Sequence, residues 1–112
     1  MSTASTDAPG SFEAPPGAPK FLIHNEGDHV GVAVQDIAPG DAEGVYMDSD
    51  RVVATRVVEH VPLGHKVALE ALPAGAEVIE YGVCVGITRA AIGRGDLVHT
   101  HNIRSARWQA SV

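Results

Sequence analysis

Histidines are the side chains of this 112-residue sequence with the clearest chemical potential. His99 and His101 are separated by one residue in the run VHTHN. Alternate residues of a strand project from one face, so a strand here would point both imidazoles the same way. This spacing suits joint metal ligation or joint contact with an anion, and Asn102 could orient either ring. Two histidines do not complete a catalytic metal site, which needs a third protein ligand and an open position.

A second candidate group follows a glycine in the run Gly64-His65-Lys66. A side chain placed just after a glycine turn can reach into a cleft. Lys66 and Arg104 could hold a carboxylate or sulfonate through charge-assisted hydrogen bonds. Structural alternatives without a function stay open. The histidines of VHTHN could cap a strand end, and the basic side chains could simply be solvated at the surface.

The remaining histidines and the one cysteine give weaker signals. His24 and His29 flank the acidic turn Glu26-Gly27-Asp28, and His60 precedes Val61-Pro62, which is typical of a surface position. Cys84 lies among valines, which favours a buried structural thiol over a nucleophile. A single cysteine excludes an internal disulfide and fits a reducing cytoplasm.

The elements that must position these residues are β-strands. Three segments are rich in β-branched residues or alternate them, namely 29–34, 51–58 and 78–87. Glycines at 31, 82 and 86 within these segments predict bulges, bends or close backbone approach. Only 66–71 has helical composition, and a short strand or a single turn fits it equally well. The acids at 41, 43, 48 and 50 predict a solvated loop.

One short pattern recurs three times along the chain. It consists of a large aliphatic residue, two residues, glycine, two residues and valine, at 61–67, 72–78 and 92–98, with a partial copy at 37–40. Each copy predicts an anchored aliphatic side chain, a turn on a glycine with positive φ, and the start of a strand. Short strands joined in this way indicate a small, irregular all-β fold.

Composition excludes several classes of function. Residues 1–20 hold four of the seven prolines, and we expect a disordered tail there, followed by one domain over 21–112. The tail lacks the features of a secretion signal. The net charge of −6 argues against nucleic-acid binding, and no apolar run is long enough to span a membrane. So small a domain is marginally stable alone, which suggests a partner.

The motifs GHK at 64–66 and VHTHN at 98–102, with the segment 78–82 and Gly86, carry a family resemblance. They resemble the SAF domain that begins altronate and galactarate dehydratases. The segment GVAV at 31–34 and the C-terminal Ala106-Arg107-Trp108 resemble more closely the small subunit of (2R)-sulfolactate sulfo-lyase, from the same superfamily. The resemblance covers residues 21–108. His29 departs from it, because the dehydratases tend to carry asparagine there.

The resemblance implies a β-clip fold and a role beside a larger catalytic subunit. The family reactions are β-eliminations from anionic 2-hydroxy acids, giving pyruvate and sulfite from sulfolactate or a 2-keto-3-deoxy acid from a sugar acid. They are associated with iron(II) or another divalent metal. The implied catalytic residues are His65, His99 and His101, with His99 and His101 as metal ligands. Lys66, Asn102 and Arg104 would bind the substrate.

Two classes of function therefore stay open. The first is the small subunit of a cytoplasmic lyase, inactive alone and completed by a large dehydratase-like subunit. The second is a non-catalytic SAF module that binds an anionic carbohydrate or a partner protein. We expect Tyr81 and Trp108 to be packing or interface residues. The segment 103–108 would then contact the large subunit or another copy of the chain.

Overall fold

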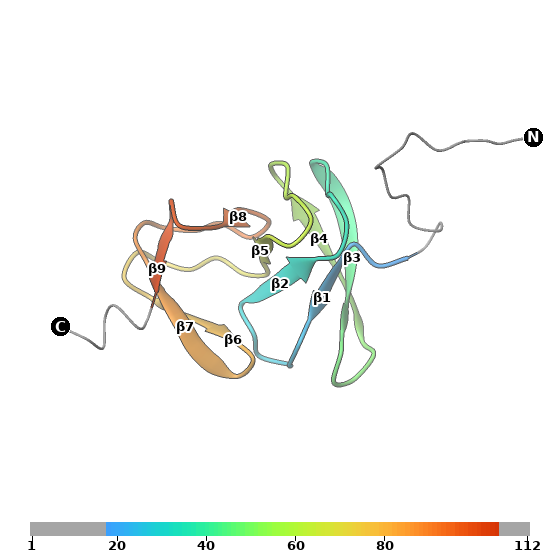
Figure 1. Cartoon of the computed structure of the whole chain (residues 1–112), viewed down its shortest axis with the longest axis horizontal. Helices are drawn as coiled ribbons and strands as arrows, with labels where there is room; N and C mark the ends of the chain where they lie inside the picture. Colours follow the sequence, from blue (N-terminus) through green and yellow to red (C-terminus); the bar gives the residue numbers. More distant parts are fainter. Residues whose placement is uncertain (1–17, 106–112) are drawn as a thin grey trace, which may run out of the picture.

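Nine short strands and no helix make up residues 18–105, the part of the chain that the structure, a computed structural model, describes (Figure 1). The strands are β1 (Phe21–Ile23), β2 (Val30–Ala33), β3 (Gly40–Tyr46), β4 (Val52–Val57), β5 (Lys66–Ala68), β6 (Glu77–Glu80), β7 (Val83–Thr88), β8 (Leu97–Val98) and β9 (Ile103–Ser105). The all-β prediction is confirmed. Most of the tail predicted for residues 1–20 lies outside the described residues. The described part contains no helix long and apolar enough to cross a membrane.

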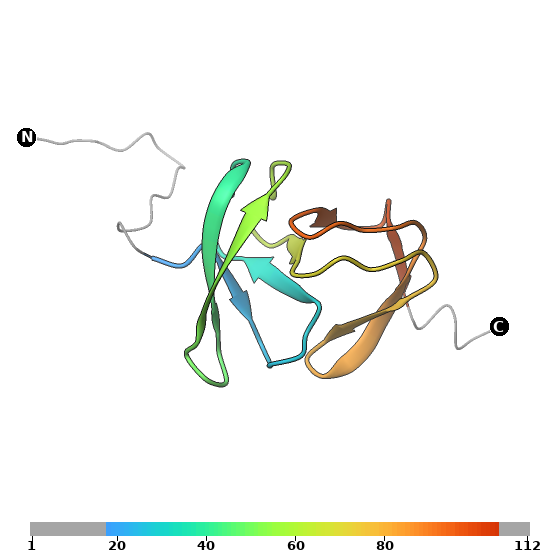
Figure 2. The ribbon, with the colours of Figure 1, turned by 180° about the vertical axis from the view of Figure 1, so that it is seen from behind.

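The strands form two sheets. The larger has the order β4-β3-β1-β2-β5-β8, and the smaller has the order β6-β7-β9. Every pairing is antiparallel except the parallel pairing of β1 with β3. The two views of the ribbon show the sheets beside each other, with β2 in contact with β6 where they meet (Figures 1 and 2).

The buried apolar residues form two clusters, and strands of the larger sheet contribute to both. The larger cluster contains Phe21, Ile23, Ala33, Ile37, Ala42, Tyr46, Val57, Val61 and Val67. The smaller contains Val30, Ala68, Val78, Ile92 and Val98. Full burial of a valine, isoleucine or phenylalanine side chain contributes about 1.5–3 kcal/mol. Strands β2 and β5 alternate between the clusters, so they connect the two halves of the core.

The recurring glycine pattern forms the turns that were predicted. Gly64, Gly75 and Gly95 have φ values of +87°, +81° and +90°, and strands β5, β6 and β8 begin soon after them. The aliphatic residues that start the copies also meet in pairs. Isolated bridges join Ile37 to Val61 and Leu72 to Ile92. The copies are therefore paired across space, which their unequal spacing in the chain did not reveal.

The predicted strand 78–87 is a hairpin, so the single-segment interpretation was incomplete. Tyr81 and Gly82 form its turn with φ values of 59° and 74°. Positive φ at both central positions is what a two-residue hairpin turn requires. The bend predicted at Gly82 is confirmed. So is the close approach predicted at Gly86, where an added Cβ would lie 2.7 Å from the Arg104 carbonyl oxygen.

The structure corrects one expectation, for the acidic segment, and decides between two alternatives for the segment 66–71. The acidic segment is only partly a loop, because Asp41 and Glu43 lie on β3 with exposed side chains, while Asp48 and Asp50 lie in the following turn. Alternation explains this, since the inward positions between the acids are Ala42 and Gly44. For the ambiguous segment 66–71 the structure has the short strand β5.

Candidate functional site

Two predicted histidines meet at the end of the β5–β8 ladder. Lys66 pairs with Val98 and Val67 with Leu97, so the next pair along the antiparallel register is His65 with His99. Their rings lie 4.9 Å apart between centroids and are tilted by 50°. The backbone of His65 is fixed, since its N–H donates to Pro62 and its carbonyl accepts from Ala33. Two imidazoles from residues 34 positions apart thus form one pair.

The His65 ring carries an unusual feature. Its Nδ1 is buried and has no hydrogen-bond partner in the part of the chain that the structure describes. Most buried side-chain polar atoms in proteins are hydrogen-bonded, and an unsatisfied one costs about 1–3 kcal/mol. A cost of this kind is common at functional sites, where the geometry serves a ligand and not the fold.

Asn102 holds the turn that presents His99. Its side-chain oxygen accepts from the His99 backbone N–H at 2.9 Å, and its amide donates to the Leu97 carbonyl at 2.7 Å. The residue is only 8% exposed. Both polar groups are thus used on the backbone of the turn and neither bonds a histidine ring, so the expected orientation of a ring by Asn102 stays a prediction. Its direct contact with substrate stays a prediction.

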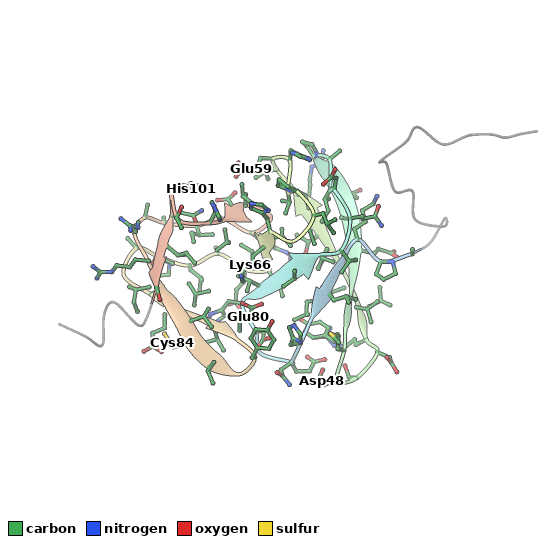
Figure 3. The ribbon with its side chains drawn as sticks, viewed as in Figure 1. Asp48, Glu59, Lys66, Glu80, Cys84 and His101 are labelled. Carbon is green, nitrogen blue, oxygen red and sulfur yellow. The ribbon has the colours of Figure 1, made fainter. Side chains whose placement is uncertain are left out.

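The reason given for pairing His99 with His101 was wrong. No strand carries the two histidines. Strand β8 ends at Val98 and β9 begins at Ile103, so His99 and His101 both lie in the intervening turn. The turn is stabilised by bonds from the backbone N–H groups of Asn102 and Ile103 to the His99 carbonyl. His101 is exposed on this turn, at the upper left of Figure 3. The ring that the structure brings to His99 is that of His65.

Lys66 lies on the other face of β5 from His65, because consecutive strand residues alternate. Its Nζ is 3.7 Å from Oε1 of Glu80, a residue that is only 3% exposed (Figure 3). Burial raises the pKa of the Glu80 carboxyl, and the Lys66 ammonium partly offsets that rise. The lysine thus joins the two sheets and does not converge with the histidine pair.

Arg104 extends from β9 with an exposed side chain. Its strand partner is Ile87, in the smaller sheet, whereas the histidine pair stands at an edge of the larger one. Nothing in the described residues brings its guanidinium to His65 or His99. Its predicted contact with substrate stays untested, as do those of Lys66 and Asn102.

A polar network at the β6–β7 turn includes His24 and His29, which the sequence marked as weaker candidates. The buried Asp28 carboxylate accepts hydrogen bonds from the backbone N–H groups of Asn25, Tyr81 and Gly82. His29 Nδ1 accepts from the Ile79 N–H at 3.0 Å, and the His24 ring lies 4.0 Å from the ring of Tyr81. These side chains dock the hairpin onto the larger sheet.

His60 is exposed, as its position before Val61-Pro62 predicted. Cys84 is free and half-buried, and its thiol donates to the Gly86 carbonyl. The predicted interface segment 103–108 is described only as far as Ser105, and Trp108 lies outside the described residues. Its role therefore stays a prediction.

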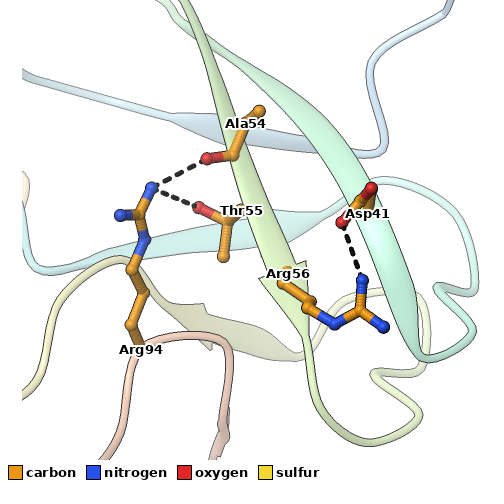
Figure 4. A pocket seen from close by; sticks show the side chains of 5 residues that line it. All are labelled: Asp41, Ala54, Thr55, Arg56 and Arg94. Atoms are coloured by element: carbon orange, nitrogen blue, oxygen red, sulfur yellow. Dashed lines mark hydrogen bonds and ion pairs between the residues drawn. The ribbon is translucent and has the colours of Figure 1, made fainter.

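The sequence did not single out Glu80 or Arg94. Glu80 could have been found, since it takes the inward position two residues after the buried Val78. Arg94 lines an open hollow of about 430 Å³ against β4, and its Nη2 donates to the Ala54 carbonyl at 2.8 Å (Figure 4). Arg56, also in this hollow, turns instead to Asp41. Since the guanidinium groups diverge, Arg94 anchors the turn before β8 and forms no anion clamp with Arg56.

The residues present do not form a metal centre alone. Among residues 18–105, no group of three or more His, Cys, Asp or Glu side chains is placed to hold one ion. His65 and His99 would supply two nitrogens at most. A divalent metal would therefore need further ligands from outside the described residues.

Comparison with known proteins places the chain in a family. The sequence model of the altronate/galactarate dehydratase SAF domain matches residues 19–106. The (2R)-sulfolactate sulfo-lyase subunit alpha of Chromohalobacter salexigens is 37% identical over 90 residues, covering 79% of this chain and 96% of that protein. The corresponding subunit of Paracoccus pantotrophus is 48% identical over 48 residues, 43% of this chain and 72% of that protein.

The altronate dehydratase of Escherichia coli is 40% identical over 78 residues, which are 70% of this chain but only 15% of that protein. The resemblance carried by GHK and VHTHN is thus confirmed. The chain belongs to the altronate/galactarate dehydratase SAF domain family.

Proposed function

We propose that the chain is the small subunit of a cytoplasmic β-elimination lyase that acts on an anionic 2-hydroxy acid together with a separate large catalytic subunit. The observation that carries this proposal is the convergence of His65 and His99, with a buried His65 nitrogen that has no partner in the described residues. Two similar proteins are themselves sulfo-lyase alpha subunits, a name that implies at least one further subunit.

The reaction begins with loss of a proton from the carbon beside the carboxylate. Sulfite or water then leaves the next carbon, and the resulting enol becomes a 2-keto acid. An imidazole can accept such a proton near neutral pH. His99 is the exposed member of the pair and takes the proton, while His65 packs against its ring and Asn102 fixes its backbone.

Iron(II) or another divalent metal belongs to the proposal as a group held mainly by the large subunit. Its chemistry would be to stabilise the negative charge that develops on the substrate. His65, His99 and His101 are the residues of this chain that could approach it. A His99 ring that accepts the proton needs its free nitrogen lone pair, so in that role it does not ligate the metal.

Sulfolactate is the substrate we favour, because 96% of one sulfo-lyase alpha subunit is matched, whereas only 15% of the altronate dehydratase is. The match therefore spans nearly all of the sulfo-lyase subunit but only a small part of the dehydratase. We expect pyruvate and sulfite as products.

The test is reconstitution. The tagged chain is expressed in its native cells, the large subunit is purified with it, and pyruvate formation from sulfolactate is followed anaerobically with ferrous iron. Substituting His99→Ala should lower kcat at least about a hundredfold, the usual contribution of a general base. His60→Ala is the matched control, since His60 is exposed and makes no contact in the described residues.

Two results would contradict the proposal. If His99→Ala retained turnover, the histidine pair would not be catalytic. If the chain co-purified with no large subunit and formed no keto acid from sulfolactate or altronate, the second class of function, a non-catalytic binding module, would take its place.

A further inference from the structure

Charge is unevenly distributed along this acidic chain. Residues 21–59 contain eight acidic residues and two arginines. Residues 81–105 contain three arginines, two histidines and a single aspartate, Asp96. The carboxylate of Asp96 accepts a hydrogen bond from the Gly93 N–H within its own turn. The segment that includes β7, β8 and β9 is therefore locally basic.

The arginines of the two segments are used differently. Arg51 and Arg56 pair with Glu26 and Asp41, at 2.7 Å and 3.2 Å. Arg89 and Arg104 are exposed, and neither forms an ion pair with any residue that the structure describes. The acidic segment thus neutralises its own cations. The Arg89 Nε donates to the Ile103 carbonyl, so the Arg104 guanidinium and the outer nitrogens of Arg89 remain available to a group outside the chain.

Arg89 and Arg104 also lie close together on the smaller sheet. Arg104 pairs with Ile87, and the Arg89 N–H donates to the Asn102 carbonyl, which continues the same ladder by one step. Ile103 packs against the core, so Arg104, its neighbour, projects outward. His101 is exposed on the adjoining turn. Arg89, His101 and Arg104 are called the β9 basic patch below.

We propose that the β9 basic patch docks the domain onto an acidic surface of the large subunit. This inference rests on the proposed function, because it assumes that such a subunit exists. The exposed guanidinium groups are better suited to a protein surface than to a small anion, which would remain largely solvated there. Complementary charge mainly accelerates association, and unpaired cations on an otherwise acidic domain would orient it before contact.

Docking through this patch would also place the histidine pair at the interface. His101, a member of the patch, lies with His99 in the turn that leads into β9, so a subunit seated on the patch would contact this turn. The large subunit could then complete the site from the side on which the chain presents its histidines.

The experiment measures association rates of immobilised chain with the purified large subunit at low and high salt. Arg104→Glu should lower the association rate about tenfold at low salt, and the difference should shrink at high salt because ions screen the contact. Arg56→Glu is the matched control, with the same charge change in the acidic segment, and should alter the rate less than about twofold.

An equal effect of both substitutions, or none from Arg104→Glu, would overturn the docking surface while the lyase assignment stood. If the immobilised chain binds no large subunit, the proposed function is contradicted. The patch can then be tested separately, by adding a hexa-aspartate peptide and following the backbone amide shifts of the chain by NMR. Amide shifts confined to residues 87–104 and lost in Arg104→Glu would support it. Shifts elsewhere, or none, would overturn it.

Discussion

Asp28 and His65 are both polar residues with buried atoms, and they differ in how those atoms are satisfied. The Asp28 carboxylate accepts three backbone hydrogen bonds and fixes the turn of the β6–β7 hairpin. The His65 Nδ1 is equally removed from solvent and has no partner in the described residues. Both regions are built on short strands and glycine turns, so the scaffold does not explain the difference.

The difference separates a structural role from a functional one. A buried polar group with all its hydrogen bonds made stabilises the fold and specifies its geometry. A buried polar group without hydrogen bonds lowers stability. Its presence is explained by an interaction with a ligand, a proton or a second polypeptide. The same contrast separates Arg51 and Arg56, which form ion pairs, from Arg89 and Arg104, which form none among the described residues.

The largest effect on stability is expected at Asp28. Asp28→Ala removes the acceptor of three N–H groups and should lower the free energy of unfolding by about 3 kcal/mol, measured by urea titration. Asp28→Asn, which keeps one carbonyl oxygen, should cost less. A loss below about 0.5 kcal/mol for the alanine variant would show that water replaces the carboxylate and would break the comparison.

His65→Phe should have the opposite effect on stability. Phenylalanine keeps a ring against His99 and removes the unsatisfied nitrogen, so the free energy of unfolding should rise by about 1 kcal/mol. Turnover of the reconstituted enzyme should fall in the same variant. A stability gain with loss of activity would identify His65 as a functional residue, whereas a loss of stability would mean that the nitrogen has a partner, such as a bound water.

Glu80 should give the smallest effect and a distinct pH dependence. Because its folded-state pKa is raised, the contribution of the carboxyl to stability is fully present below the unfolded pKa, and it is lost as pH rises through the folded value. Glu80→Gln should remove this pH-dependent component and change stability at neutral pH by no more than about 1 kcal/mol. Urea midpoints at mildly acidic and neutral pH measure it.

Lys66→Met provides the contrast for this pair. It leaves the Glu80 carboxylate buried without a counter-ion and should cost more at neutral pH than at acidic pH. If Glu80→Gln were instead the more damaging change, the carboxylate would resemble Asp28 as a required acceptor.

Local sequence was enough to find several elements. The β-branched segments gave β2 and β4, and the glycine pattern gave the turns at Gly64, Gly75 and Gly95. Both signals work because strand preference and positive φ are properties of one or a few neighbouring residues. Strands β1, β8 and β9 have two or three residues each, too short for a clear alternation.

The composition of the site was likewise visible in the sequence, but its arrangement was not. His65, His99 and His101 were identified from their motifs. The strand expected to carry both His99 and His101 is absent, because the chain turns between β8 and β9, and the joint role of these two histidines stays a prediction.

The sequence by itself thus determined an all-β chain with glycine turns, an acidic first half and a family resemblance carried by two histidine motifs. Only the tertiary structure decided that His65 faces His99, that Lys66 points to Glu80 on the other side of β5, and that Arg104 stays unpaired within the described residues. The reason is register: the β5–β8 pairing joins residues 30 or more positions apart, and no local preference encodes it.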